Sequence, residues 1–183
     1  MVLTKSYIEG LYILDPLVFE DTRGVFFETF NLQNFKKKIG LEVEFVQDNE
    51  SISKQNVLRG LHFQLPPFAQ GKLVRVVSGK AIDIAVDLRK NSPTYGKHEI
   101  VELSSENKKQ FWIPPGFAHG FVALEENTIF NYKCTNYYSP VSERTIQWND
   151  PLLNIDWEVS QPIISEKDQK GLDFATFVTE FEY

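Results

Sequence analysis

The chain has 183 residues, which suits a single domain spanning residues 1–183 with a sizeable buried core. Its net charge of −6 argues against a nucleic-acid coat, because phosphate binding needs a basic face, and its one cysteine excludes a disulfide framework or a thiolate metal cluster. The first residues have no apolar signal-peptide core and no apolar run reaches membrane-spanning length, so we expect a cytoplasmic protein without membrane association.

Short runs of alternating apolar and polar residues dominate the chain, separated by Gly, Pro, Asn and Ser. They predict strands over residues 7–14, 42–47, 57–64, 72–77, 81–88, 99–103, 120–124 and 128–138. Two segments favour short helices: residues 32–39, with Asn31 as N-cap, and the stretch after Ser165, where Ser165 and Asp168 resemble a capping box. This distribution is typical of an all-β sandwich or barrel.

One strand pair can be aligned by hand. If a two-residue turn at 78–79 joins its strands, Lys72 lies opposite Ala85 and Val74 opposite Asp83, all on one face. A barrel lumen that binds a polar ligand would explain the Lys72 and Asp83 side chains there, and so would a solvated sheet face. We favour the lumen, because the apolar Val74 and Ala85 share that face.

His62 lies among apolar residues, with Arg59 shortly before it and Lys72 after it. An imidazole titrates near neutrality, and neighbouring cations suit an anionic ligand. The combination predicts a proton-transfer site for a negatively charged molecule; a core histidine satisfied by a carbonyl is the alternative. We expect a bulge at Gly60 that brings Arg59 and His62 to the same side.

The other histidines are less informative. His119 follows a Pro-Pro-Gly turn and aligns with Phe117 and Phe121, so it is either a buried imidazole in an aromatic patch or a donor on a rigid rim. His98 is expected to be exposed. A cupin-type metal site usually has a second histidine two residues after the first, where this chain has Gln64, so we expect no metal. Tyrosines 132, 137 and 138 suit packing, proton donation or ring stacking, and their spacing does not choose among these roles.

Ordered sequence blocks along nearly the whole chain resemble the dTDP-4-dehydrorhamnose 3,5-epimerase family. The blocks are RGVFFE (23–28), QDN (47–49), VLRGLHFQ (57–64), QGKLVRVVSG (70–79), DIAVDLRKNSPTYGK (83–97), WIPPGFAHGF (112–121), YKCTNYYSP (132–140), ERTIQWNDP (143–151) and SEKD (165–168). Asn136 departs from the family's usual Asp, and Phe63 from its frequent Tyr. The resemblance implies an all-β, cupin-type double-stranded β-helix, or jelly-roll barrel, with a few short helices.

The resemblance also implies roles for individual residues. It implies that His62 is the proton acceptor and that Asp168 is the carboxylate that orients it. It also implies that Tyr132 is the proton donor on the opposite side and that Lys72 is the cation at the enolate oxygen. Further positions are implied to contact the nucleotide sugar, with Tyr138 stacking on thymine: Arg23, Phe26, Glu28, Gln47, Asn49, Arg59, Asp83, His119, Tyr138, Glu143 and Lys167.

The implied reaction inverts C3 and C5 of dTDP-4-dehydro-6-deoxy-D-glucose to give dTDP-4-dehydro-L-rhamnose, in a homodimer whose N-terminal segment, with residues 23–28, crosses to the partner. The C4 carbonyl acidifies the hydrogens on both carbons, so a base, an acid and a cation suffice without a cofactor. The alternatives are an epimerase of one carbon, a metal-dependent cupin enzyme and a non-catalytic sugar-binding cupin. The missing second histidine disfavours the metal enzyme, and a binding protein has no need for four catalytic groups.

Overall fold

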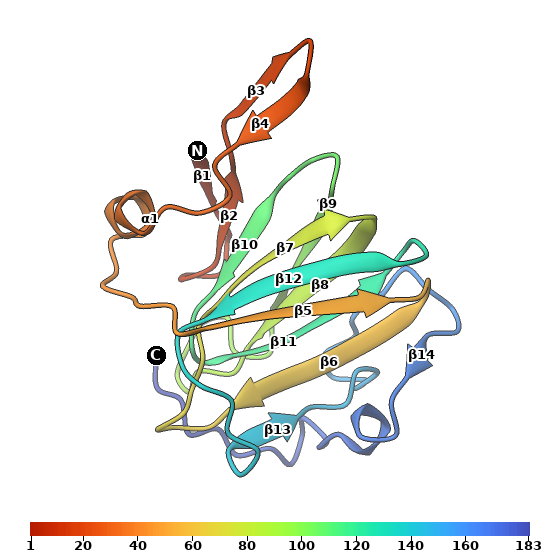
Figure 1. Ribbon diagram of the computed structural model, residues 1–183. Helices are drawn as coiled ribbons and strands as arrows, with labels where there is room; N and C mark the ends of the chain where they lie inside the picture. The colour runs from red at the N-terminus through yellow and green to blue at the C-terminus, as the bar shows by residue number, and fades with distance from the viewer.

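The computed structural model describes residues 1–183 and is built around two facing antiparallel sheets (Figure 1). The strands of the first sheet are, in spatial order, β1 (Val2–Lys5), β2 (Tyr12–Asp15), β10 (Gln110–Ile113), β7 (Lys72–Ser78), β12 (Thr128–Cys134) and β5 (Gln47–Ser53). The second sheet contains β13 (Glu143–Thr145), β6 (Val57–Gln64), β11 (Phe117–Ala123), β8 (Lys80–Asp87) and β9 (His98–Ser104), with β14 (Ile163–Ile164) parallel to β6. The predicted jelly-roll barrel is confirmed.

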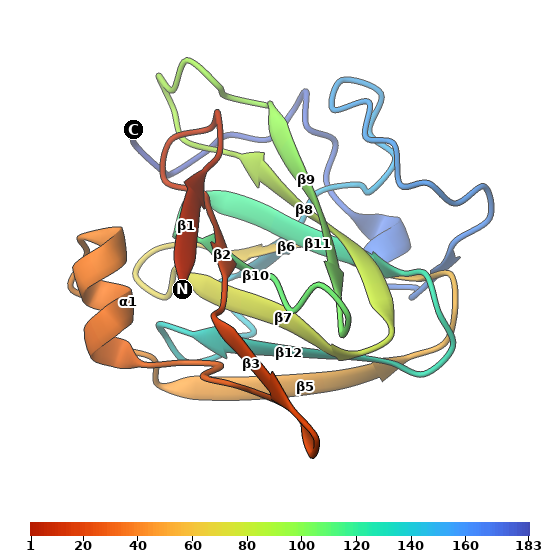
Figure 2. The ribbon, with the colours of Figure 1, turned by 90° about the horizontal axis from the view of Figure 1, so that it is seen from above.

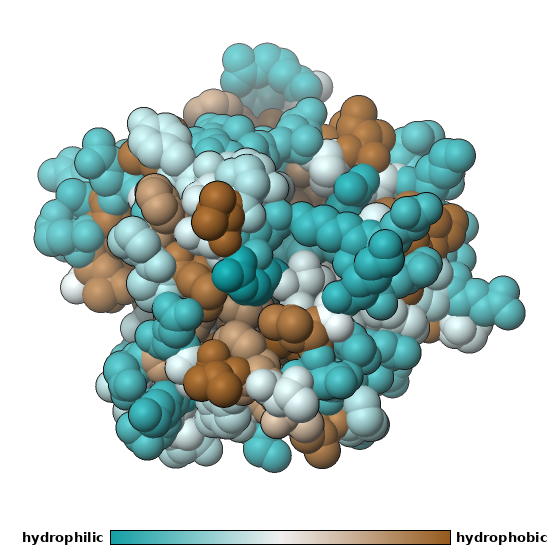
Figure 3. Space-filling model, turned by 90° about the horizontal axis from the view of Figure 1, so that it is seen from below, coloured by the Kyte–Doolittle hydropathy of each residue, from teal (hydrophilic) through white to brown (hydrophobic).

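Apolar side chains from both sheets fill much of the space between them. Val74 on β7, Phe121 on β11 and Phe130 on β12 belong to one buried cluster, and the rings of Phe121 and Phe130 stack with their centroids 3.9 Å apart. The C-terminal segment covers the other face of the second sheet with Trp157 and Phe181. Seen from below, the surface there is mainly hydrophilic, with separate hydrophobic patches (Figure 3). The second sheet therefore packs apolar side chains on both of its faces.

Helix α1 (Leu32–Ile39) lies beside the first sheet (Figure 2) and confirms the prediction over residues 32–39. The Asn31 side chain accepts a hydrogen bond from the backbone N–H of Asn34 at 3.0 Å, as an N-cap does, and Gly40 ends the helix in the left-handed conformation. Phe35 packs edge-on against Trp112 of β10, with ring centroids 5.2 Å apart. Neither α1 nor the 3₁₀ helix η1 (Asp168–Lys170) has the length or apolar character to cross a lipid bilayer.

A hairpin of β3 (Val18–Asp21) and β4 (Gly24–Phe27) projects away from the barrel (Figure 1). Every residue of β3 is exposed, and Phe19 and Phe26 are 57% and 72% exposed. The hairpin thus presents large apolar side chains to its surroundings without packing them on the chain's own core.

The predicted hairpin at residues 78–79 is wrong, because β7 and β8 lie in different sheets. Gly79 has φ +82° and carries the chain around a corner from one sheet to the other, and a Cβ there would lie 2.6 Å from the Thr128 hydroxyl. Lys72 and Asp83 nevertheless face the same lumen, from opposite sheets, and Asp83 is fully buried. The lumen interpretation is therefore confirmed although the hairpin that suggested it does not exist.

Four local predictions also need correction. Residues 42–46 form no strand, and residues 7–11 form a turn that precedes β2. His98 is half-buried on β9, not exposed. At residue 165 only half of the capping box forms: the Ser165 hydroxyl accepts from the Asp168 N–H at 3.1 Å, but the Asp168 carboxylate points to His62. The alternation pattern also misses β3, whose residues are all exposed, and β10, whose residues are all buried, because neither alternates.

Candidate active site

The barrel lumen opens into a cavity of about 500 Å³ between the two sheets. A smaller pocket of about 260 Å³ shares His62, Lys72, Tyr132, Tyr138 and Glu143 with it. The second sheet contributes His62 and Arg59 from β6 and His119 from β11, and the first contributes Lys72 from β7 and Tyr132 from β12. Predicted site residues that the structure brings together around these two pockets are Gln47, Asn49, Arg59, His62, Lys72, His119, Tyr132, Tyr138, Glu143, Lys167 and Asp168.

A β-bulge places His62 and Arg59 on the lumen side, as predicted. The pairing between β6 and β11 changes register between His119 and Phe121, so that His119 pairs with His62 and Phe121 with Arg59. Gly60 has φ +137°, and a Cβ on it would lie 2.5 Å from the Cα of Gly120. Only glycine fits this close approach of two strands, and the bulge depends on it.

His62 is held by a buried carboxylate. Its Nε2 lies 2.6 Å from Oδ1 of Asp168, whose Oδ2 accepts a hydrogen bond from the Gly60 N–H at 3.3 Å. Burial alone would raise the pKa of Asp168, but hydrogen bonds from His62, Gly60 and Ser165 and the charge of His62 hold that pKa below its usual range. An ionised Asp168 keeps the proton of a neutral His62 on Nε2, so Nδ1, which has no partner in the chain, is free to accept one.

Lys72 and Tyr132 stand on the sheet opposite His62. Burial lowers the pKa of Lys72, while Cys134, Asp83 and Glu143 act in the opposite direction. Burial raises the pKa of Tyr132, so its phenol keeps its proton at neutral pH. One wall thus carries an imidazole that can accept a proton, and the other a protonated phenol and a lysine.

His119 has a carboxylate partner of its own, deeper in the barrel. Its Nε2 lies 2.9 Å from Oδ2 and 3.1 Å from Oδ1 of Asp83, and both residues are buried. Burial lowers the pKa of His119 and raises that of Asp83. Of the two alternatives given by the sequence, His119 is therefore the buried imidazole and not a donor on a rim. It nevertheless lines the cavity. Asp83, predicted as a substrate contact, does not line it. Nowhere in residues 1–183 do three or more His, Cys, Asp or Glu side chains form a group that could hold a metal ion.

Polar side chains at the mouth form a connected chain of hydrogen bonds. Glu143 accepts from the Tyr138 hydroxyl at 2.8 Å and pairs with Lys167 at 2.5 Å. The Tyr138 N–H donates to Oε1 of Gln47 at 3.0 Å, and the Gln47 amide donates to Asn49 at 3.0 Å. These bonds hold an exposed tyrosine ring beside two amides and a cation, an arrangement suited to a planar ring joined to an anion.

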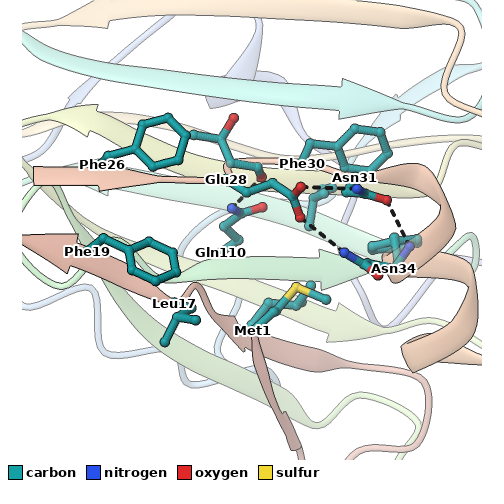
Figure 4. Close-up of a pocket in the computed structure, with 13 residues that line it drawn as sticks. Met1, Leu17, Phe19, Phe26, Glu28, Phe30, Asn31, Asn34 and Gln110 are labelled. Carbon is teal, nitrogen blue, oxygen red and sulfur yellow. Dashed lines mark hydrogen bonds between the residues drawn. The ribbon is translucent and has the colours of Figure 1, made fainter.

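Three predicted site residues lie outside the lumen, on or next to the β3–β4 hairpin. The Arg23 side chain is 88% exposed and pairs with Asp21 at 2.6 Å. Phe26 and Glu28 line a separate pocket of about 330 Å³ (Figure 4). Glu28 there accepts hydrogen bonds from the Asn31 and Asn34 amides at 3.0 and 3.2 Å. None of the three lines the lumen cavity of its own chain.

The structure adds residues that the sequence interpretation missed. Ser51 lines the cavity and its buried hydroxyl has no hydrogen-bond partner, while Ser53 accepts a hydrogen bond from Nε of Arg59 at 3.1 Å. Gln64 ties down the loop that carries Tyr138: its amide donates to Phe68 O at 2.6 Å and to Tyr137 O at 3.1 Å. Residues 47, 49, 51 and 53 alternate along β5, but all are polar, so a search for apolar alternation passes over them.

Fold and site together combine a jelly-roll barrel with a lumen in which a histidine–carboxylate pair faces a tyrosine and a lysine. A model of the dTDP-4-dehydrorhamnose 3,5-epimerase family matches residues 5–176. The chain therefore belongs to the dTDP-4-dehydrorhamnose 3,5-epimerase family, and it is an isomerase.

Individual relatives agree with this assignment. The dTDP-4-dehydrorhamnose 3,5-epimerase of Salmonella typhimurium is 57% identical over 169 residues, which cover 92% of each chain. The structure of RmlC from Legionella pneumophila in complex with dTDP-4-keto-L-rhamnose is 44% identical, with a TM-score of 0.95 over 100% of this chain and 98% of that one. ChmJ, a 3'-monoepimerase from Streptomyces bikiniensis, is 31% identical, with a TM-score of 0.89 over 93% of this chain and 87% of that one.

Proposed function

We propose that this protein inverts C3 and C5 of dTDP-4-dehydro-6-deoxy-D-glucose and releases dTDP-4-dehydro-L-rhamnose. The observation that carries the proposal is the placement of the His62–Asp168 pair on one wall of the lumen, with Tyr132 and Lys72 on the other. Inversion at a carbon next to a carbonyl needs a base on one face of the sugar and an acid on the other, and this lumen has both.

The catalytic roles follow from this placement. Nδ1 of His62 removes the proton from C3, and the electron pair of the broken C–H bond moves through C4 to the carbonyl oxygen. The Lys72 ammonium stabilises the resulting enolate, and the Tyr132 phenol returns a proton to the opposite face. Solvent then takes the proton from His62 and returns one to Tyr132, and the same groups act at C5. The C4 carbonyl of the substrate is the electron sink, so the reaction requires no cofactor.

Substrate binding is assigned to the remaining cavity residues. Tyr138 stacks on thymine, and the cations Arg59 and Lys167 bind the pyrophosphate, which explains why an acidic protein gathers positive charge at this mouth. Gln47, Asn49, His119 and Glu143 supply hydrogen bonds. A nucleotide sugar is also what the relative from Legionella pneumophila holds in its structure.

The projecting hairpin supports a homodimer as part of this proposal. Arg23, Phe26 and Glu28 are absent from the chain's own lumen cavity, and the exposed Phe19 and Phe26 suit contact with a second copy. The hairpin of one protomer would then complete the partner's site.

Mixing two defective variants tests this exchange. Arg23→Ala combined with Phe26→Ala damages only the hairpin, and His62→Ala damages only the lumen. After subunit exchange, a heterodimer contains one complete site, so part of the parental activity should return. Absence of recovery, or full activity of a monomer at micromolar concentration, would contradict the crossed dimer.

The reaction itself is tested by incubating the protein with the 4-keto sugar nucleotide and determining the configuration of the product at C3 and C5 by proton NMR. The proposal predicts inversion at both carbons. Inversion at one carbon would make the protein a single-carbon epimerase. ChmJ, a 3'-monoepimerase, is a relative of that kind. Tight binding without any product would make it a binding protein.

Residues 1–183 are proposed to act as one cupin-like domain, and the reaction is proposed to take place in the cytoplasm. A single, buried cysteine without a disulfide suits that compartment.

A further inference from the structure

Asp83 is a buried carboxylate that serves the lumen without lining it. It is fully buried and lines neither of the two pockets, whereas His119 and Lys72 both line the 500 Å³ cavity. Both carboxylate oxygens lie within hydrogen-bond distance of Nε2 of His119. A group in this position has no access to the sugar, so any effect it has on the reaction must pass through its neighbours.

We propose that Asp83 is a positioning residue for the epimerisation: it orients His119 and stabilises the ammonium form of Lys72 without touching the substrate. This inference rests on the proposed epimerase function. It replaces the direct substrate contact that the sequence resemblance implies for Asp83.

The orientation of His119 follows from its hydrogen bonds. When Asp83 is ionised its carboxylate only accepts, so His119 then carries its proton on Nε2, directed to Asp83. Nδ1 is then unprotonated and has no partner in the chain, which makes it an acceptor for a hydroxyl group of the sugar. If Asp83 were an amide, its NH₂ group could donate to Nε2, and His119 would then carry its proton on Nδ1 and lose this acceptor.

The second effect concerns the charge of Lys72. The titratable groups that influence it are Asp83 from β8, Glu143 from β13 and Cys134 from β12, and the lumen around it also contains His62, His119 and Tyr132. Asp83 and Glu143 are the carboxylates in this group; burial raises the pKa of Asp83, while the charge of His119, its hydrogen bond and the charge of Lys72 lower it. Glu143 is already engaged by Lys167 at 2.5 Å and by the Tyr138 hydroxyl, whereas no lysine or arginine pairs with Asp83. Asp83 is thus the less compensated carboxylate, and its charge opposes the lowering of the Lys72 pKa by burial.

The matched test compares Asp83→Asn with Asp87→Asn. Asp87 lies on the same strand, is also fully buried, and bonds Arg89, Ser92 and Thr94, and none of these four residues lines either pocket. In Asp83→Asn the Lys72 ammonium loses a neighbouring negative charge, so the alkaline limb of the kcat/KM profile should move to lower pH by about one unit. We expect kcat to fall by about tenfold at neutral pH, and KM to rise by about two- to tenfold because the sugar hydroxyl loses its acceptor on His119. Asp87→Asn should leave the alkaline limb at its parental position even if the fold becomes less stable.

Tyr132 could also produce an alkaline limb, so the comparison is repeated in a Tyr132→Phe background, with deuterium exchange into the substrate as the readout. An unmoved limb in Asp83→Asn, or an equal shift in Asp87→Asn, would overturn the inference. A parent protein that exchanges no deuterium would instead overturn the proposed function itself, so the two failures are distinguishable.

A measurement on the parent covers the case in which Asp83→Asn does not fold. ¹⁵N NMR of labelled histidines should show His119 protonated on Nε2 and not on Nδ1 at neutral pH. ¹³Cε NMR of labelled lysines, with the Lys72 signal assigned by its loss in Lys72→Arg, should show Lys72 as an ammonium there. The Nδ1–H tautomer or a neutral Lys72 would overturn the inference.

Discussion

Two histidine–carboxylate pairs stand side by side in one lumen, and they differ mainly in depth. His62 and His119 are directly paired residues of neighbouring antiparallel strands, and each bonds an aspartate through Nε2, at 2.6 and 2.9 Å. The side chain of His62 is 28% exposed and that of His119 only 8%. Asp168 has a lowered pKa and Asp83 a raised one. Burial, not residue type, separates the two pairs.

The difference in burial favours His62 over His119 as the proposed proton acceptor. His62 is partly exposed and lies beside Asp168, whose pKa is lowered, which suits the proposed proton acceptor. Burial lowers the His119 pKa, and Lys72 and His62 act in the same direction against the raising effect of Asp83, so an imidazolium there is disfavoured. One pair is therefore suited to proton transfer and the other to hydrogen bonding in a fixed protonation state. Substitutions at the two pairs and at Tyr132 test this difference.

Replacing the base should have the largest effect. His62→Ala should lower kcat by about 10²- to 10⁴-fold, because water cannot fill the role of Nδ1 with the same geometry. Nucleotide-sugar binding, measured by calorimetry, should remain close to the parental value. His98→Ala is the matched control, since His98 lies on β9 outside the cavity. Parental turnover in His62→Ala would assign the base elsewhere.

Removing the acid should uncouple the two halves of the reaction. In Tyr132→Phe the enolate still forms at His62 and can be reprotonated from the same face. We expect inverted product to fall by about 10²-fold, while solvent deuterium still enters the recovered substrate. The measurement is NMR of both substrate and product. Inverted product at the parental rate would leave water or another tyrosine, such as Tyr138, as the donor.

Loss of the orienting carboxylate should have a smaller effect. Asp168→Asn keeps the size of the side chain but no longer fixes the proton on Nε2 of His62 or stabilises the imidazolium. We expect kcat to fall by about 10- to 100-fold, as for other histidines deprived of their orienting partner. Initial rates at saturating substrate measure the loss. A fall in binding with unchanged kcat would show that Asp168 serves the substrate and not the histidine.

The deeper histidine should matter least for proton transfer. His119→Gln retains a hydrogen-bonding side chain but removes the imidazole. We expect kcat/KM to fall by about two- to tenfold, the worth of one hydrogen bond, with deuterium exchange intact. Loss of exchange as severe as in His62→Ala would break the division between the two pairs.

Acid should weaken the fold partly through Asp168. Its folded-state pKa lies below the unfolded value, so its contribution to the free energy of unfolding is present above the unfolded pKa and is lost as pH falls through the folded one. Asp168→Asn should therefore lose less stability than the parent between about pH 6 and pH 3, measured by urea unfolding. An equal loss in both proteins would contradict the lowered pKa.

The sequence predicts some elements of this molecule well and others not at all. Strand β6 and helix α1 occupy the residues that their patterns predict, because one alternates and the other has a cap at each end. The predicted pairing of β7 with β8 is wrong. A glycine such as Gly79 indicates a turn, but it does not reveal whether the chain folds back in the same sheet or crosses to the facing one. The β3–β4 hairpin is missed because it has no buried face within its own chain.

In the site, too, some residues could be predicted from the sequence and others could not. The motif around His62 predicts a histidine with cations nearby, and residue-by-residue resemblance adds Tyr132 and Asp168 at distant positions. Neither reveals that Asp83 lies behind the wall of the cavity and not in it, because depth in a barrel depends on how the strands of two sheets face each other. Ser51 and Ser53 escape notice because a strand whose inward residues are all polar looks like a loop.

Deuterium incorporation during turnover in heavy water tests most directly whether the His62–Asp168 pair removes the proton from both carbons. If the His62–Asp168 pair is the one base for both carbons, the parent should place deuterium at C3 and C5 of the product, and His62→Ala should place it at neither. Deuterium at only one carbon in the parent, or continued exchange at either carbon in His62→Ala, would contradict the account.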